Sequence, residues 1–150
     1  LMESGLSDAA VVHIATHAVV RGSGGATTLQ LAGDRGAGSP TLDTIAGTGL
    51  AADLVYLSCC EGTRRRHVGA GSADLARAFL TAGARSVVAS SVRVDDHAAL
   101  AMARSFTSEL AAGAAPDAAL RTAQLETRQA DPELSHPYYW AFYRVVTAIR

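Results

Sequence analysis

Residues 53–59 read DLVYLSC, a short apolar run with Cys60 directly after it. Two similar runs stand elsewhere in the chain, AVVHIAT at 10–16 and RSVVAS at 85–90. Short runs that stay apolar at successive positions are typical of strands buried on both faces of a parallel sheet. The sequence therefore predicts three buried strands.

Segments with helical patterning separate these strands. The expected helices are Thr41-capped residues 42–45, Ala73–Ala82 with Ser72 as N-cap and Gly83 as stop, a helix from Asp95 or Asp96 to about Ala112, and one from Pro116 to about Gln129. The remaining expected strands are Thr27–Ala32, as an edge strand or hairpin, and Trp140–Ile149. Strands that alternate with helices predict an α/β fold, a mostly parallel sheet with helices on both faces. A chain of 150 residues fits one such domain.

Composition excludes several classes of protein. The net charge is −1, so bulk attraction to nucleic acid or to a membrane surface is not expected. No apolar run approaches the roughly 20 residues that a membrane span needs. The two cysteines, Cys59 and Cys60, are adjacent, which rules out a disulfide scaffold and favours a reduced, cytoplasmic setting.

Two reactive side chains follow neighbouring predicted strands. His17 comes after the first strand, and Cys60 comes after the strand at 53–59. Ligands of open α/β sheets bind beyond the carboxyl ends of the strands, where an imidazole and a thiol could share one cleft. An imidazole can take the proton of a thiol, whose ordinary pKa is about 8.5, and so produce a nucleophile. The backbone amides of Ala18 and Cys60 are candidate donors to an oxyanion.

The neighbouring histidine and cysteine have plainer interpretations. His13 lies inside a strand and is expected to be a packed core residue, and Cys59 is expected to point away from Cys60 toward the core. A metal site is a weaker alternative. The candidate ligands are His13, His17, Cys59, Cys60 and His67. Zinc binds such side chains, but the spacing of these residues matches no common zinc site. No metal is therefore expected.

An ordered series of motifs covers nearly the whole chain. It comprises IATHA at 14–18, LQLAG at 29–33, LSCCEG at 57–62, LARAFLTAGARSVVASSVRVDD at 75–96 and HPYYWAFY at 136–143. The series resembles the CHAT domain, a bacterial caspase-like domain often joined to TPR repeats. Caspases carry a Gln-Ala-Cys-x-Gly signature with the catalytic His about 50 residues upstream, and here His17 precedes Cys60 at a similar spacing.

The resemblance implies a three-layer α/β/α caspase-like sandwich. It implies that the first strand of the family is absent and that residues 1–150 are a single domain from the C-terminal part of a longer chain. It also implies peptide-bond hydrolysis by a Cys–His dyad, with His17 as base, Cys60 as nucleophile and no cofactor. The expected partners are a protein or peptide substrate and TPR or other domains of the same full-length chain.

A carboxylate after the third strand leads us to expect that the substrate has a basic P1 residue. Related Arg-specific members of the clan bind a basic P1 side chain with a carboxylate in this region, which Asp96 matches best, with Asp95 beside it. Both residues could equally be a helix cap and a favourable charge at the helix N-terminus.

Two departures from the family pattern leave a second function open. Ala18 stands where the family usually has Gly, and residues 91–93 read SVR in place of Leu-Trp-x. A catalytically inactive caspase-like signalling or scaffold domain is therefore the alternative, and a small-molecule thiol hydrolase a more distant one. The aromatic stretch Pro137–Trp140 is expected to anchor the last strand, or else to wall the substrate groove.

Overall fold

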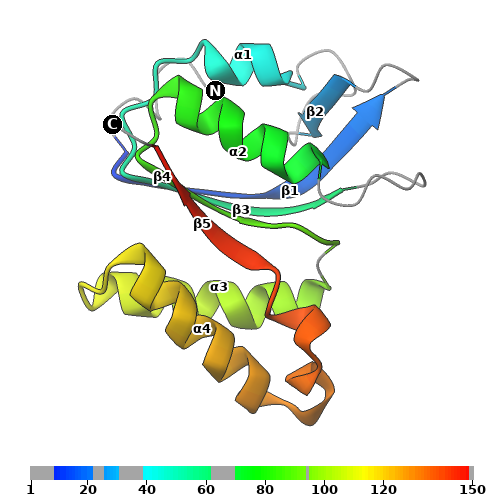
Figure 1. The fold of residues 1–150 in the computed structure, drawn as a ribbon, viewed down its shortest axis with the longest axis vertical. Helices are drawn as coiled ribbons and strands as arrows, with labels where there is room; N and C mark the ends of the chain where they lie inside the picture. Colours follow the sequence, from blue (N-terminus) through cyan, green and yellow to red (C-terminus); the bar gives the residue numbers. More distant parts are fainter. Residues whose placement is uncertain (1–8, 22–25, 31–38, 62–69, 94, 149–150) are drawn as a thin grey trace.

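The computed structural model describes residues 9–21, 26–30, 39–61, 70–93 and 95–148. A single twisted sheet lies between two helical layers, with α1 and α2 on one face and α3 and α4 on the other (Figure 1). The elements are β1 (Val11–Arg21), β2 (Ala26–Gln30), α1 (Leu42–Ala46), β3 (Leu54–Glu61), α2 (Ala70–Ala82), β4 (Ser86–Ser90), α3 (Asp96–Ala111), α4 (Pro116–Ala130), the 3₁₀ turns η1 (Pro132–Ser135) and η2 (Pro137–Tyr139), and β5 (Tyr143–Thr147).

The strand order in the sheet is β2-β1-β3-β4-β5. The three central strands β1, β3 and β4 are parallel, while β2 and β5 pair antiparallel at the two edges. The predicted α/β/α sandwich with a mostly parallel sheet is thus confirmed. The parallel centre brings the carboxyl ends of β1, β3 and β4 to one edge of the sheet.

Alternation along the central strands divides the core in two. Val55, Leu57 and Cys59 of β3 face α1 and α2, where they pack with Leu75 and Phe79 of α2. The intervening β3 residues face the other layer, in a core that contains Tyr56, Val88, Met102, Phe106 and Tyr143. This core takes no buried residue from β1, so α3 and α4 leave the outer face of β1 uncovered.

Helix ends follow the capping signals of the sequence. Thr41 Oγ1 accepts a hydrogen bond from the Thr44 amide at 3.2 Å and caps α1. Asp95 caps α3 by accepting hydrogen bonds from the amides of His97 and Ala98. Gly83 ends α2 with a φ of 118°, a conformation that residues with a Cβ rarely adopt.

Several predicted bounds were wrong. β1 extends past Thr16 to Arg21, because its second half pairs with β2 in an antiparallel hairpin. β3 extends past Cys59 to Glu61, because it stays paired with β1 as far as Ala18. α2 begins at Ala70, so Ser72 lies inside the helix, and β5 is the short Tyr143–Thr147.

Candidate active site

His17 and Cys60 are direct partners in the ladder between β1 and β3. The parallel register pairs Thr16 with Cys59, His17 with Cys60 and Ala18 with Glu61. Directly opposed residues of adjacent strands lie about 5 Å apart. Both His17 and Cys60 lie within their strands, which corrects the expectation that each comes after the end of a strand. The two strand positions are nevertheless adjacent at the carboxyl end of the sheet.

The side chain of His17 lies on the uncovered outer face of β1. Val12 and Ala18 of the same strand are buried in the core beneath α1 and α2. Because side chains alternate along a strand, His13, Ala15 and His17 project to the opposite face, and all three are exposed there. Among the described residues, α3 and α4 do not cover the imidazole of His17, which is exposed to solvent.

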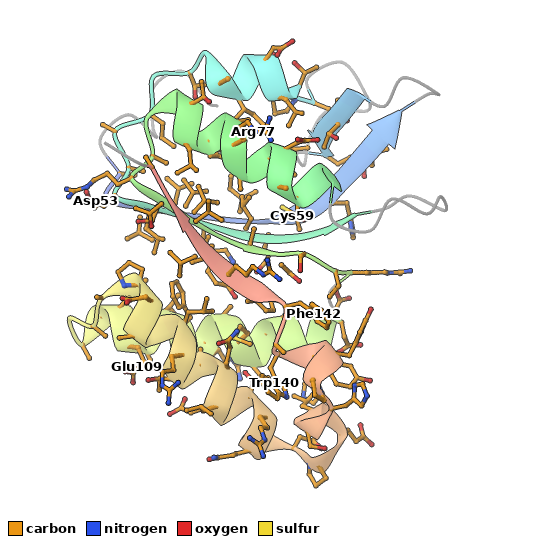
Figure 2. All side chains as sticks on the ribbon, in the orientation of Figure 1. Asp53, Cys59, Arg77, Glu109, Trp140 and Phe142 are labelled. Carbon is orange, nitrogen blue, oxygen red and sulfur yellow. The ribbon has the colours of Figure 1, made fainter. Side chains whose placement is uncertain are left out.

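Cys59 faces the other way. It is buried against α2, as predicted, and its thiol donates a weak hydrogen bond to the Ile14 carbonyl at 3.8 Å. Figure 2 shows it between α2 and the sheet. It lines a small pocket there with Ser72 and Ser90. Cys59 is therefore separated by the sheet from the face that carries His17.

Ala18 is a buried residue of the sheet interior, 3% exposed. It pairs with Glu61 of β3 on one side and with Leu29 of β2 on the other. Its methyl group packs in the core beneath α1 and α2, on the face opposite to His17. The methyl group that distinguishes Ala18 from the usual Gly is therefore buried away from the face that carries His17. The role of the Ala18 and Cys60 amides as oxyanion donors stays a prediction.

His13 is not the core residue that the sequence predicts. Its ring is partly exposed on the uncovered face of β1, because the cover of α3 and α4 begins at β3. The imidazole meets the buried ring of Tyr56 edge-on at 4.9 Å, and its Nε2 lies 3.3 Å from Ser58 Oγ, within hydrogen-bond distance. Partial burial lowers the pKa of His13 below its usual 6.5.

Ser58 was not predicted as a site residue. The sequence offers no signal for it except that it stands two residues before Cys60 in the same strand. It lies on β3 two residues before Cys60, opposite Ala15. Burial raises the pKa of the Tyr56 phenol, and the side chains of Ser58 and Tyr143 partly oppose this rise. The polar side chains of His13, Tyr56 and Ser58 thus lie close together on β1 and β3, on the face of the sheet that also carries His17.

The lowered pKa of His13 predicts a pH dependence of stability. Between the pKa of the folded state and 6.5, the unfolded chain binds more protons than the folded one, so the free energy of unfolding falls as the pH falls through this window. Denaturant unfolding of wild type and His13→Gln from pH 8 to pH 5 measures the effect. We expect the wild-type curve to fall more steeply below pH 6.5, and parallel curves would contradict the prediction.

The two carboxylates after β4 have different environments. Asp95 Oδ1 accepts hydrogen bonds from two backbone amides of α3 at 3.0 and 3.1 Å, so it serves as the N-cap. Asp96 stands in the first turn of the same helix and is exposed. The cap interpretation therefore applies to Asp95, and Asp96 is the carboxylate that remains available to a ligand.

The aromatic stretch before β5 is joined to the loop between β4 and α3. The hydroxyl of Tyr138 donates to the Arg93 carbonyl at 2.9 Å, and the Ser91 amide donates to the Phe142 carbonyl at 3.0 Å. Trp140 packs against the core beneath α3 and α4, as an anchor should, and the Arg128 guanidinium lies 5.8 Å above its ring. Sequence reasoning did not single out Phe142, whose exposure depends on where β5 begins.

The described residues hold no group of three or more His, Cys, Asp or Glu side chains placed to bind a metal ion, and His67 lies outside them. Within the same part of the chain, every helix is too short or too polar to cross a bilayer.

Comparison with known proteins gives one family. The model of the CHAT domain, a caspase-like and protease-related family, matches residues 1–148. No curated protein matches the chain. Because the match covers nearly all of the sequence, and the fold and motif order agree with it, the chain belongs to the CHAT domain family.

Proposed function

We propose that this domain is a cysteine endopeptidase in which Cys60 is the nucleophile and His17 the general base and acid. The observation that supports the proposal most directly is the register, which pairs these two residues across adjacent strands. The open face above His17 supports it as well, because a peptide must reach both groups from solvent.

In the proposed reaction, His17 takes the proton of the Cys60 thiol, and the thiolate attacks the carbonyl carbon of the peptide bond. The tetrahedral intermediate collapses as its C–N bond breaks, and His17 returns the proton to the leaving amine. Water, deprotonated by His17, then hydrolyses the thioester and releases the acid product and the free thiol. The backbone amides of Ala18 and Cys60 are the proposed oxyanion donors. The cycle needs no cofactor.

The proposed substrate is a protein or peptide with Arg or Lys at P1. Two observations support this choice: Asp95 is engaged as a helix cap, and Asp96 beside it is exposed. A guanidinium held by a carboxylate gains a charge-assisted hydrogen bond, which contributes about 1.5–3 kcal/mol.

Acyloxymethyl ketones with Arg or Asp at P1 test this function. We expect the Arg compound to label the wild-type chain and to leave Cys60→Ala unlabelled. The variant Asp96→Asn should be labelled about 10- to 100-fold more slowly by the Arg compound, because the charged contact is lost. Intact-mass spectrometry over a time course measures the rates.

Asp117→Asn is the matched control, since Asp117 occupies the first turn of α4 as Asp96 does in α3. Its labelling rate should equal that of wild type. A preference for the Asp compound would refute the basic P1 specificity alone. No Cys60-dependent labelling by either compound would refute the peptidase function and favour the scaffold alternative.

A further inference from the structure

Two aromatic side chains in the segment before β5 are exposed to solvent. Tyr138 is 41% exposed and Phe142 36%, and their ring centroids lie 6.5 Å apart. We call these two side chains the Tyr138–Phe142 patch. Trp140, between them in the sequence, packs into the core beneath α3 and α4 instead. Figure 2 shows Phe142 at the end of the sheet where β5 begins.

Hydrogen bonds connect both residues of the patch to the loop between β4 and α3. The hydroxyl of Tyr138 donates to the Arg93 carbonyl, and both the amide and the hydroxyl of Ser91 donate to the Phe142 carbonyl, at 3.0 and 3.3 Å. Tyr138 also contacts Tyr139 edge-on at 5.5 Å. Aromatic rings that are fixed before binding offer a large contact area at a small cost in conformational entropy, which favours recognition.

The patch lies at the same edge of the sheet as the proposed catalytic pair. Tyr143, next to Phe142, pairs with Ser90 at the carboxyl end of β4. The turns η1 and η2 contact α4, which places them on the sheet face that also carries His17. β3 and β5 are separated only by β4, so the lateral distance between them is two strand spacings, about 10 Å.

The order of the strands sets the direction of a bound peptide. In the proposed reaction His17 of β1 protonates the leaving amine, which would place the amine side of the cleaved bond toward β1. The acyl side, which ends at the carbonyl attacked by Cys60 on β3, would then extend over β4 toward β5, because β4 and β5 follow β3 in the sheet. An extended peptide advances about 3.3 Å per residue, so about three residues cover the distance from β3 to β5.

We propose that the Tyr138–Phe142 patch binds an apolar or aromatic side chain at P4, three residues before the P1 residue of the substrate. This inference rests on the proposed peptidase function and adds a second determinant of specificity to it. The two rings would cover one face of the substrate side chain and exclude water from it.

Fluorogenic tetrapeptides test the proposal. Phe-Ala-Ala-X and Ser-Ala-Ala-X are compared, where X is the P1 residue that labels fastest. We expect wild type to cleave the Phe peptide with about tenfold higher kcat/KM, as shared burial of one aromatic ring implies. Phe142→Ser should reduce this ratio to about twofold or less, because the Phe peptide loses the ring on which its P4 side chain would lie. Phe142→Leu should keep most of the ratio.

Leu125→Ser is the matched control, since Leu125 is an exposed apolar residue on α4, 38% exposed, and should leave the ratio unchanged. A wild-type ratio near one, or a ratio that survives Phe142→Ser, would overturn the inference while leaving the peptidase function standing. If no peptide is cleaved, binding is measured instead. Fluorescence anisotropy of labelled forms of both peptides then gives their affinities for the Cys60→Ala chain. Equal affinity for both peptides would overturn the inference, and about tenfold tighter binding of the Phe peptide that depends on Phe142 would support it.

Discussion

Replacement of Cys60 by alanine is expected to lower kcat for peptide hydrolysis by about four orders of magnitude or more. Loss of a nucleophile removes the covalent route altogether, and comparable substitutions in peptidases cost about 10⁴- to 10⁶-fold. Cleavage of the best fluorogenic peptide, followed at substrate concentrations above KM, measures the loss. The free energy of unfolding, measured with denaturant, shows that the variant still folds.

The adjacent Cys59 provides the matched control. Its thiol lies in the core beneath α2 and contacts the Ile14 carbonyl, on the other face of the sheet from His17. Cys59→Ala should therefore keep kcat within a few-fold of wild type and lower stability by about 1 kcal/mol, as loss of one buried atom implies. If Cys59→Ala abolished hydrolysis and Cys60→Ala did not, the two roles would have to be exchanged.

Gly83→Ala is expected to lower the free energy of unfolding by about 3 kcal/mol or more. Gly83 ends α2 with a φ of 118°, which a residue with a Cβ rarely adopts, and an added Cβ would lie 2.3 Å from the Leu50 carbonyl oxygen. That oxygen belongs to the backbone, and the Leu50 amide is itself bonded to the Ala82 carbonyl, so the contact cannot be relieved by a rotamer change. Backbone strain and overlap both add to the cost.

Gly113→Ala separates the two contributions. Gly113 also has a positive φ, 89°, but an added Cβ there meets nothing within 4 Å. Its substitution should cost about 1 kcal/mol, from backbone conformation alone. Urea unfolding of both variants measures the difference, and equal losses at the two glycines would show that the contact with Leu50 is unimportant.

Local signals in the sequence predicted the helix ends well. Thr41 before α1, Asp95 before α3 and Gly83 after α2 each act through atoms within a few residues, so their effect can be judged without knowledge of the fold. Ser72 shows the limit of this reasoning. It has the side chain of an N-cap, yet α2 begins at Ala70, because packing against the sheet can extend a helix past a capping residue.

The ends of the strands depend on partners far away in the sequence and were predicted less well. The length of β1 follows from β2, which continues its pairing after β3 has ended, and no residue between Thr16 and Arg21 reveals this by itself. The exposure of His13, which was expected to be a core residue, has a similar cause. An apolar strand is expected to be covered on both faces, but the cover of α3 and α4 stops short of β1.

The sequence likewise predicted some features of the candidate site and missed others. Consecutive strands of a parallel sheet were expected to bring His17 and Cys60 to neighbouring positions, and the register pairs them. Alternation correctly placed Cys59 in the core. The catalytic roles and the specificity of Asp96 stay predictions. The exposed ring of Phe142 could not be anticipated, because its surroundings include the loop after β4, which is about 50 residues away in the sequence.

The pairing of β1 on both of its edges bears on how this domain could be switched on and off. At His17 the strand is bonded to β3 on one side and to β2 on the other. Withdrawal of the imidazole by backbone movement would break two ladders together, which amounts to unfolding a large part of the sheet. For the proposed peptidase, we therefore expect a regulator to leave the backbone at His17 in place and to act on the access of substrate.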